Sequence, residues 1–215
     1  MPKNVDHELR REELLEAVWR VVARDGLEGA TIRGMAQETG WSVGVLAHYF
    51  KDKDDILVSA VDLALQRCEA RWESQLADLR GLAALRSLVL DNLPLDAERE
   101  LETKFLMNYW SRAIRDRTRV LRPARRGPEL IDRLIELIRE AQQEGEIDAG
   151  RSPQDIAELL LGLIDGFSLH SLLDPERLTR ERQARLIEAE LDRLNSEAKG
   201  VAAGRDASTQ RARRH

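Results

Sequence analysis

Residues 31–50 hold the pattern that most constrains how this chain can fold. Thr31 can cap a short first helix with an apolar inner face, and Ser42 can cap a second one. Gly40 stands between them, and a glycine accepts the positive φ of a sharp turn without steric cost. Two short helices joined in this way predict a helix-turn-helix, which presents its second helix to the major groove of DNA.

The same segment, continued to Leu57, resembles the N-terminal domain of the tetracycline-repressor (TetR) family of bacterial regulators. Its ending, Gly44–Phe50, departs slightly from the commoner Thr-Leu-Tyr-Tyr-His-Phe form but stays within the pattern. The resemblance implies an all-helical regulator that binds DNA. The matching positions are Thr31, Ile32, Arg33, Ala36, Gly40, Ser42, His48, Tyr49, Phe50 and Lys53.

The predicted second helix is short and carries few polar side chains. Gly44 lets its backbone approach DNA closely, and Val43 can meet a thymine methyl group. We expect His48 and Tyr49 either to contact phosphates or to pack beneath the helix. Trp41 either contacts the sugar-phosphate backbone or fills the core, and both alternatives stay open.

Cations on either side of this helix complete the predicted DNA contacts. Arg33, at the head of the preceding helix, is a candidate for a contact to a base edge or the groove. The resemblance places Lys53 at the start of the following helix, where free N–H groups and a cation suit a phosphate. The full predicted set is Thr31, Arg33, Trp41, Ser42, Val43, Gly44, His48, Tyr49 and Lys53.

The rest of the 215-residue chain is also expected to be helical. Aromatic residues make up 4% of the chain and charged residues 34%, and Leu and Ala recur at helical spacing. Start and stop signals predict about nine helices and no strand. We expect a helix-turn-helix domain at 1–53 with a disordered arm at 1–8, an effector-binding and dimerisation domain at 54–196, and a disordered basic tail at 197–215.

Charge and residue content narrow the function further. Residues 1–60 contain 8 Lys or Arg against 11 Asp or Glu, a net charge of −3, which indicates modest non-specific affinity for DNA. Cys68 is alone and forms no internal disulfide, and neither an apolar leader nor an uninterrupted membrane span is evident. We therefore expect a cytoplasmic protein without a membrane partner. No catalytic, cofactor or metal motif is present, so we expect no enzyme, no cofactor and no metal.

The stretch Phe105–Trp110 is apolar almost all round, which is typical of a buried helix. In the TetR family the corresponding helix lines an effector pocket, so the resemblance makes these residues pocket candidates, with plain core as the alternative. A buried Asn108 would need a hydrogen-bond partner. The predicted pocket set is Phe105, Asn108, Tyr109 and Trp110, with Phe167 and His170 as weaker members.

The helix at 156–173 has apolar residues on most of its circumference, which predicts packing on two sides. Gly162 and Gly166, four residues apart, permit close approach of another helix. The resemblance implies a four-helix subunit interface, to which each subunit gives this helix and the last one. We predict Gly162, Gly166, Ile187 and Leu191 at that interface. The second half also resembles, more loosely, the choline-responsive betaine regulators.

These features predict a homodimeric transcriptional repressor that a small molecule of unknown identity releases from a palindromic operator on double-stranded DNA. The alternative is a helical ligand-binding or interaction protein whose helix-turn-helix no longer functions. The acidic N-terminal region favours this alternative. A helical enzyme is a third class, but the sequence offers it no catalytic constellation.

Overall fold

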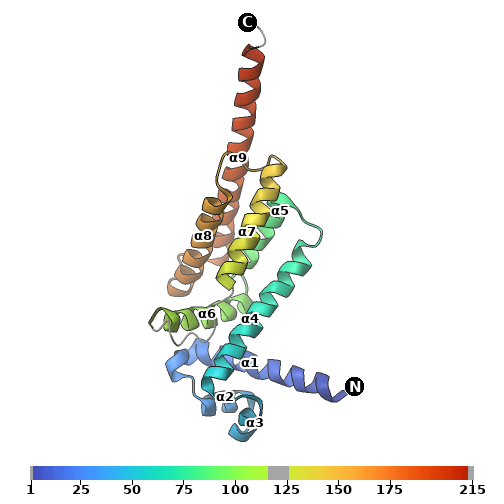
Figure 1. The fold of residues 1–215 in the computed structure, drawn as a ribbon. Helices are drawn as coiled ribbons and strands as arrows, with labels where there is room; N and C mark the ends of the chain where they lie inside the picture. The colour runs from blue at the N-terminus through green and yellow to red at the C-terminus, as the bar shows by residue number, and fades with distance from the viewer. Residues whose placement is uncertain (1, 116–125, 213–215) are drawn as a thin grey trace. The chain divides into compact units, whose positions relative to one another are not determined.

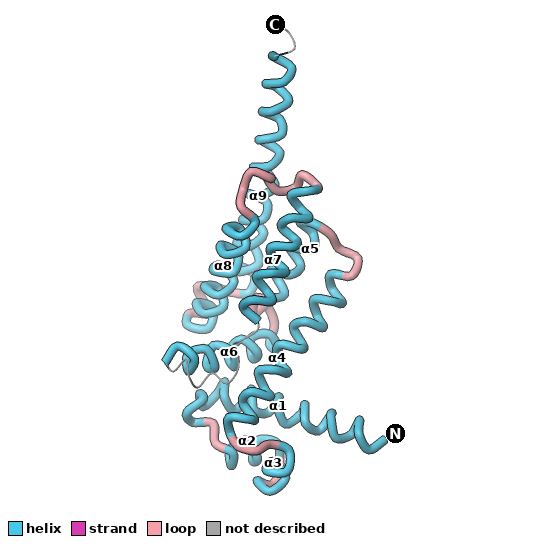
Figure 2. Tube along the Cα trace, viewed as in Figure 1, coloured by secondary structure: helices cyan, strands magenta, loops and turns pink. Residues whose placement is uncertain are grey.

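The computed structural model describes residues 2–115 and 126–212, and all regular structure there is helical (Figure 2). The predicted all-α fold is confirmed, with nine helices among the described residues. In chain order (Figure 1) they are α1 (Pro2–Gly29), α2 (Ile32–Thr39), α3 (Val43–Tyr49), α4 (Lys53–Leu76), α5 (Gly81–Asp91), α6 (Ala97–Arg115), α7 (Arg126–Gln143), α8 (Pro153–Leu173) and α9 (Arg180–Ala212).

The helices form two compact units. The first contains Met1–Ala70 and Asp96–Arg125, and the second contains Arg71–Leu95 and Arg126–His215. Helix α4 begins in the first unit and ends in the second, whereas α6 belongs wholly to the first. This grouping differs from the boundary predicted after residue 53, because the apolar side chains of α6 share a core with the helix-turn-helix.

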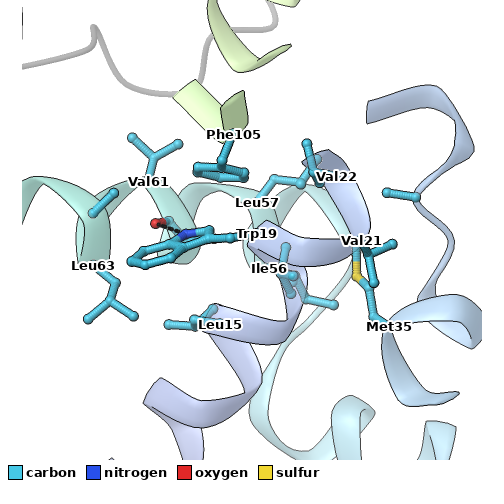
Figure 3. Packing of buried hydrophobic residues seen from close by; sticks show 14 of the residues in the cluster. Leu15, Trp19, Val21, Val22, Met35, Ile56, Leu57, Val61, Leu63 and Phe105 are labelled. Carbon is cyan, nitrogen blue, oxygen red and sulfur yellow. Dashed lines mark hydrogen bonds between the residues drawn. The ribbon is translucent and has the colours of Figure 1, made fainter. Parts of the chain in front are cut away.

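Trp19 of α1 lies in the middle of the first unit's core. The residue is 1% exposed, and its Nε1 donates a hydrogen bond of 3.0 Å to the carbonyl oxygen of Ala60 on α4 (Figure 3). Its ring centroid lies 6.1 Å from that of Phe105 on α6. Since a buried indole N–H needs an acceptor, this one residue fixes the spacing of three helices.

The second unit is a helical bundle. Helix α7 packs against α5 and α8, and α5 also packs against α9. Arg86 of α5 forms ion pairs with Glu188 and Asp192 of α9. The last turns of α4 are joined to this bundle through Asp91 of α5, a buried carboxylate. It accepts hydrogen bonds from Arg71, Trp72 and Gln75, at donor–acceptor distances between 3.1 and 3.3 Å.

Both ends of the chain are helical where the sequence predicted a disordered arm and tail. Helix α1 begins at Pro2, and proline is favoured at the first position of a helix. Helix α9 continues to Ala212, since residues 197–212 contain no proline and several good helix formers. Residues 213–215 of the predicted tail lie outside the described part of the chain.

Among the described residues, α8 alone has the length and hydropathy of a membrane-spanning helix. The sequence had predicted no such stretch. Of its 18 most apolar consecutive residues, 33% are buried within the structure. The interior helix of a bundle meets the same criteria of length and composition, and α8 packs against α7.

Candidate DNA-binding interface and effector helix

Local hydrogen bonds build the turn between α2 and α3. The backbone N–H of Gly34 donates to Oγ1 of Thr31, at 3.0 Å, and that of Val45 donates to Oγ of Ser42, at 3.3 Å. Thr31 and Ser42 are therefore the N-caps of α2 and α3, as their side chains predicted. Gly40 ends α2 with a φ of 70°, in the left-handed region that favours glycine.

Helix α3 presents a nearly apolar face to solvent. Leu46 is buried, with 1% exposed, and holds the helix against the core, while Val43 and Val45 are 45% and 40% exposed. Gly44, Ala47 and His48 are exposed as well. A Cβ added to Gly44 would meet only Oγ of Ser42, at 3.8 Å, so the centre of the face is open.

Trp41 and Tyr49 support this helix from the inner side. Both are half-buried and pack against the core of the first unit, with ring centroids 5.7 Å apart. The ring of Tyr49 also meets the edge of His48. This packing favours the supporting role for Trp41 and Tyr49, and it leaves His48, which is exposed, free to face a ligand.

The predicted phosphate contact Lys53 is half-buried and already has a partner. Its Nζ donates a hydrogen bond of 2.7 Å to the carbonyl oxygen of Leu27, near the end of α1. An ammonium group has three donors, so one hydrogen bond to α1 is compatible with a phosphate contact. Arg33 is exposed on the first turn of α2.

Part of the acidic charge of the first unit is neutralised by ion pairs between α1 and α2. Arg24 and Arg20 of α1 hydrogen-bond to Glu38 of α2, at 3.0 and 3.1 Å. The hydrogen bond from Arg24, followed by that from Arg20, holds the pKa of the Glu38 carboxyl below its usual value. The ion pairs tie α2 to α1, and surface pairs of this kind add little stability.

The predicted pocket residues of α6 fall into two groups. Phe105, with no exposed surface, and Tyr109, 7% exposed, belong to the core of the first unit. Burial raises the pKa of the Tyr109 phenol. Asn108 and Trp110 are half-buried, and Nδ2 of Asn108 donates to the carbonyl oxygen of Lys104 one turn back in α6, at 2.9 Å.

Helix α6 is also attached to the start of α4. Nη1 of Arg112 lies 2.9 Å from Oδ1 of Asp54, in the first turn of α4. The hydrogen bond to Asp54 raises the pKa of the Arg112 guanidinium. The pair is not evident from the sequence, because the two residues are 58 positions apart in the chain.

The two predicted pocket residues of α8 belong to the second unit. Phe167 is half-buried and His170 is exposed. Their assignment to an effector pocket remains a prediction.

The predicted dimer contacts of α9 need correction. Ile187 and Leu191 have no exposed surface in a single chain. They therefore belong to the core of the second unit and have no surface with which to contact a partner subunit. Gly162 and Gly166 of α8 are different, because a Cβ added to either would meet no atom within 4 Å.

Three exposed leucines accompany these glycines and were missed in the sequence. Leu159, Leu169 and Leu173 are 58%, 45% and 71% exposed. With Gly162 and Gly166 they follow a spacing of three, four, three and four residues, which is the heptad pattern of helices that pack together. We call these five residues the α8 stripe. The heptad spacing of these residues is the feature of the sequence from which the α8 stripe could have been predicted.

Comparison with known proteins agrees with this architecture. Residues 14–60 match the bacterial regulatory proteins of the tetR family, and residues 81–196 match the C-terminal domain of BetI-type transcriptional repressors. The HTH-type transcriptional regulator PksA of Bacillus subtilis is 32% identical over 190 residues, which are 87% of this chain and 90% of PksA. BetI of Burkholderia mallei is 28% identical, over 90% of this chain and 97% of its own length.

Solved structures share the fold. A transcriptional regulator from Rhodococcus sp. Rha1 superposes with a TM-score of 0.73 and 24% identity, over 86% of this chain and 95% of its own. A regulator from Saccharomonospora viridis, solved in complex with choline, gives a TM-score of 0.75 and 22% identity, over 85% and 95%. The chain belongs to the TetR family of bacterial transcriptional regulators, which bind DNA through a helix-turn-helix, and it has the C-terminal domain of the BetI-type repressors.

Proposed function

We propose that this regulator is a homodimeric repressor that holds a palindromic operator and leaves it when a small quaternary ammonium compound binds. The proposal assigns DNA binding to residues 1–53, and effector binding and dimerisation to residues 54–196. The protein acts in the cytoplasm, where its operator lies.

The α8 stripe is the observation that carries the dimer. It lies on the side of α8 opposite the buried residues Ile156, Leu160 and Ile164, given a turn of about 100° per residue. Exposed leucines in a continuous row are unfavourable in water and mark an interaction surface. Glycines between them allow a second helix to come close. Two copies of α8 packed stripe to stripe bury this surface, and Leu186 of α9, 40% exposed, is a further apolar side chain available to a partner.

The dimer is needed for DNA recognition in this proposal. Two copies of α3 held about 34 Å apart enter successive major grooves on one side of the duplex. Gly44 and His48 face the groove, and Arg33 and Lys53 contact the flanking phosphates or base edges. Thr31 and Ser42 hold the two helices in place as caps, through the hydrogen bonds that they accept from Gly34 and Val45.

The effector is proposed from the chemistry of α6 together with the relatives. Trp110 is the half-buried aromatic side chain of this helix, and an indole face attracts a quaternary ammonium through its quadrupole. Asn108 precedes Trp110 by two residues, about 200° around the helix, so the two side chains leave α6 on different sides. Choline is bound in the Saccharomonospora viridis structure, and the C-terminal domain here is of the BetI type. These two facts support choline, or a compound that shares its ammonium group, as the effector.

Two measurements test the proposal. Sedimentation should show a dimer, and the full-length protein should retard a palindromic duplex from the region next to its own gene. Choline should reverse that retardation, whereas an equal concentration of sodium chloride should not. A monomer that still binds the palindrome would refute the dimeric mechanism, and a complex unchanged by saturating choline would refute the choice of effector.

A Gly44→Leu variant tests the docking of α3. The open space at residue 44 accommodates the side chain in the free protein, so the fold should survive. In the complex the same side chain would stand between α3 and the bases. Specific binding should be lost while the thermal unfolding midpoint stays within a few degrees of wild type. Operator affinity equal to wild type would show that this face does not enter the groove.

A further inference from the structure

The exposed face of α3 contains almost no hydrogen-bonding side chain. Val43, Gly44, Val45, Ala47 and His48 are its exposed residues, and His48 is the one among them with a polar group. Arg, Lys, Asn and Gln, which read guanine and adenine through paired hydrogen bonds, are absent from the helix. A helix of this composition must therefore recognise bases by other contacts.

The exposed side chains have a definite arrangement. At about 100° per residue, Gly44 and His48 stand opposite Leu46; Val45 lies on one side of them, and Ala47 and then Val43 lie on the other. The face is low at Gly44 and Ala47, so the helix can lie deep in a groove. The two valines are then brought against the base edges on its flanks.

Of the groups on base edges in the major groove, the C5 methyl of thymine is the one that projects apolar surface, whereas N7, O6, N4, N6 and O4 are hydrogen-bond donors or acceptors. A valine pressed against a donor or acceptor leaves that group without water or partner, which is costly. Against a methyl group the same valine buries apolar surface on both sides. The exposed valines thus suit thymine and oppose the other bases.

We infer that this regulator reads its operator chiefly by contacts of Val43 and Val45 with thymine methyl groups. The inference rests on the proposed docking of α3 in the major groove and names the base that the docking selects. Each half-site should contain thymines at one or two fixed positions, where A·T pairs cannot be exchanged for G·C pairs.

Deoxyuridine gives a direct test, since it pairs like thymine but lacks the methyl group. A binding duplex is first selected with the full-length protein from a pool of random sequences. Each thymine is then replaced by deoxyuridine in turn, and the affinity is measured by fluorescence anisotropy. Loss of one buried methyl group should weaken binding by about fourfold at the contacted positions, and replacement elsewhere should change nothing.

Protein variants connect the effect to the two side chains. Val43→Ala and Val45→Ala should each lose the sensitivity to deoxyuridine at one position of the half-site. Both residues are exposed, so the variants should unfold at the wild-type temperature. Ile114→Ala is the matched control, because Ile114 is an exposed apolar residue on α6, at 82%, and this variant should keep the full response.

The outcomes separate the inference from the proposed function. Equal affinity for the thymine and deoxyuridine duplexes at every position would overturn the inference while DNA binding stands. Selected duplexes without fixed thymines would do the same, as would an unchanged deoxyuridine response in both valine variants. Failure to select any duplex would overturn the proposed docking together with the inference, and would point to a protein partner for the exposed valines.

Discussion

Replacing Gly162 by phenylalanine tests the proposed dimer with little effect on the subunit itself. A Cβ at residue 162 would have no heavy atom within 4 Å, so the new ring begins in open space. In a two-fold interface the substitution occurs twice, and each bulky group inserted into a packed contact costs about 1–3 kcal/mol. Two copies therefore cost at least about 2 kcal/mol, which weakens the dimer roughly thirtyfold.

Sedimentation equilibrium of wild type and Gly162→Phe measures this difference in the dimer dissociation constant. Operator affinity should fall with it, because a monomer holds one half-site. Gln154→Phe is the matched control, since Gln154 is exposed on the same helix about a quarter turn from the α8 stripe. A dissociation constant equal to that of wild type in Gly162→Phe would show that the α8 stripe is not the subunit interface.

Three further variants test the first unit. Lys53→Ala should lower the free energy of unfolding by about 0.5–1.5 kcal/mol, because the hydrogen bond to Leu27 is lost. It should also reduce the slope of log affinity for DNA against log salt concentration by roughly one unit. An unchanged slope would give Lys53 a structural role alone. Trp110→Ala should keep operator affinity and weaken the response to choline in the same retardation assay, and a wild-type response would make Trp110 a packing residue. Trp19→Phe should lower the free energy of unfolding, measured in urea, by about 1–3 kcal/mol, because it removes the hydrogen bond to Ala60 and leaves a void. Wild-type stability in this variant would show that Trp19 does not hold the three helices together.

The helix-turn-helix was predictable because short-range signals determine it. Thr31 and Ser42 cap helices through bonds to residues three positions away, and Gly40 supplies the left-handed turn. Each signal lies within one or two helical turns of the structure that it specifies. No knowledge of distant contacts was needed to find α2 and α3.

The dimer surface was harder to predict because two faces of the last helices are apolar. The most regular apolar row of α9 includes Ile187 and Leu191, and it faces the interior of the second unit. On α8 the inner row and the α8 stripe have similar composition, so hydrophobic periodicity cannot decide which one is covered by the subunit itself. That decision depends on the packing of α5, α7 and α9, which is set by contacts distant in sequence.

The place of α6 in the structure bears on how an effector would act. Its residue Phe105 lies against Trp19 in the core that supports the helix-turn-helix, and its Arg112 is hydrogen-bonded to Asp54 in the first turn of α4. The next residue toward the N-terminus, Lys53, holds that same turn to the end of α1. A ligand that binds Trp110 more tightly when α6 is displaced would therefore act on a helix that packs against α1 and is hydrogen-bonded to the start of α4. Its differential affinity for the two positions of α6 sets the largest change in operator affinity that it can produce.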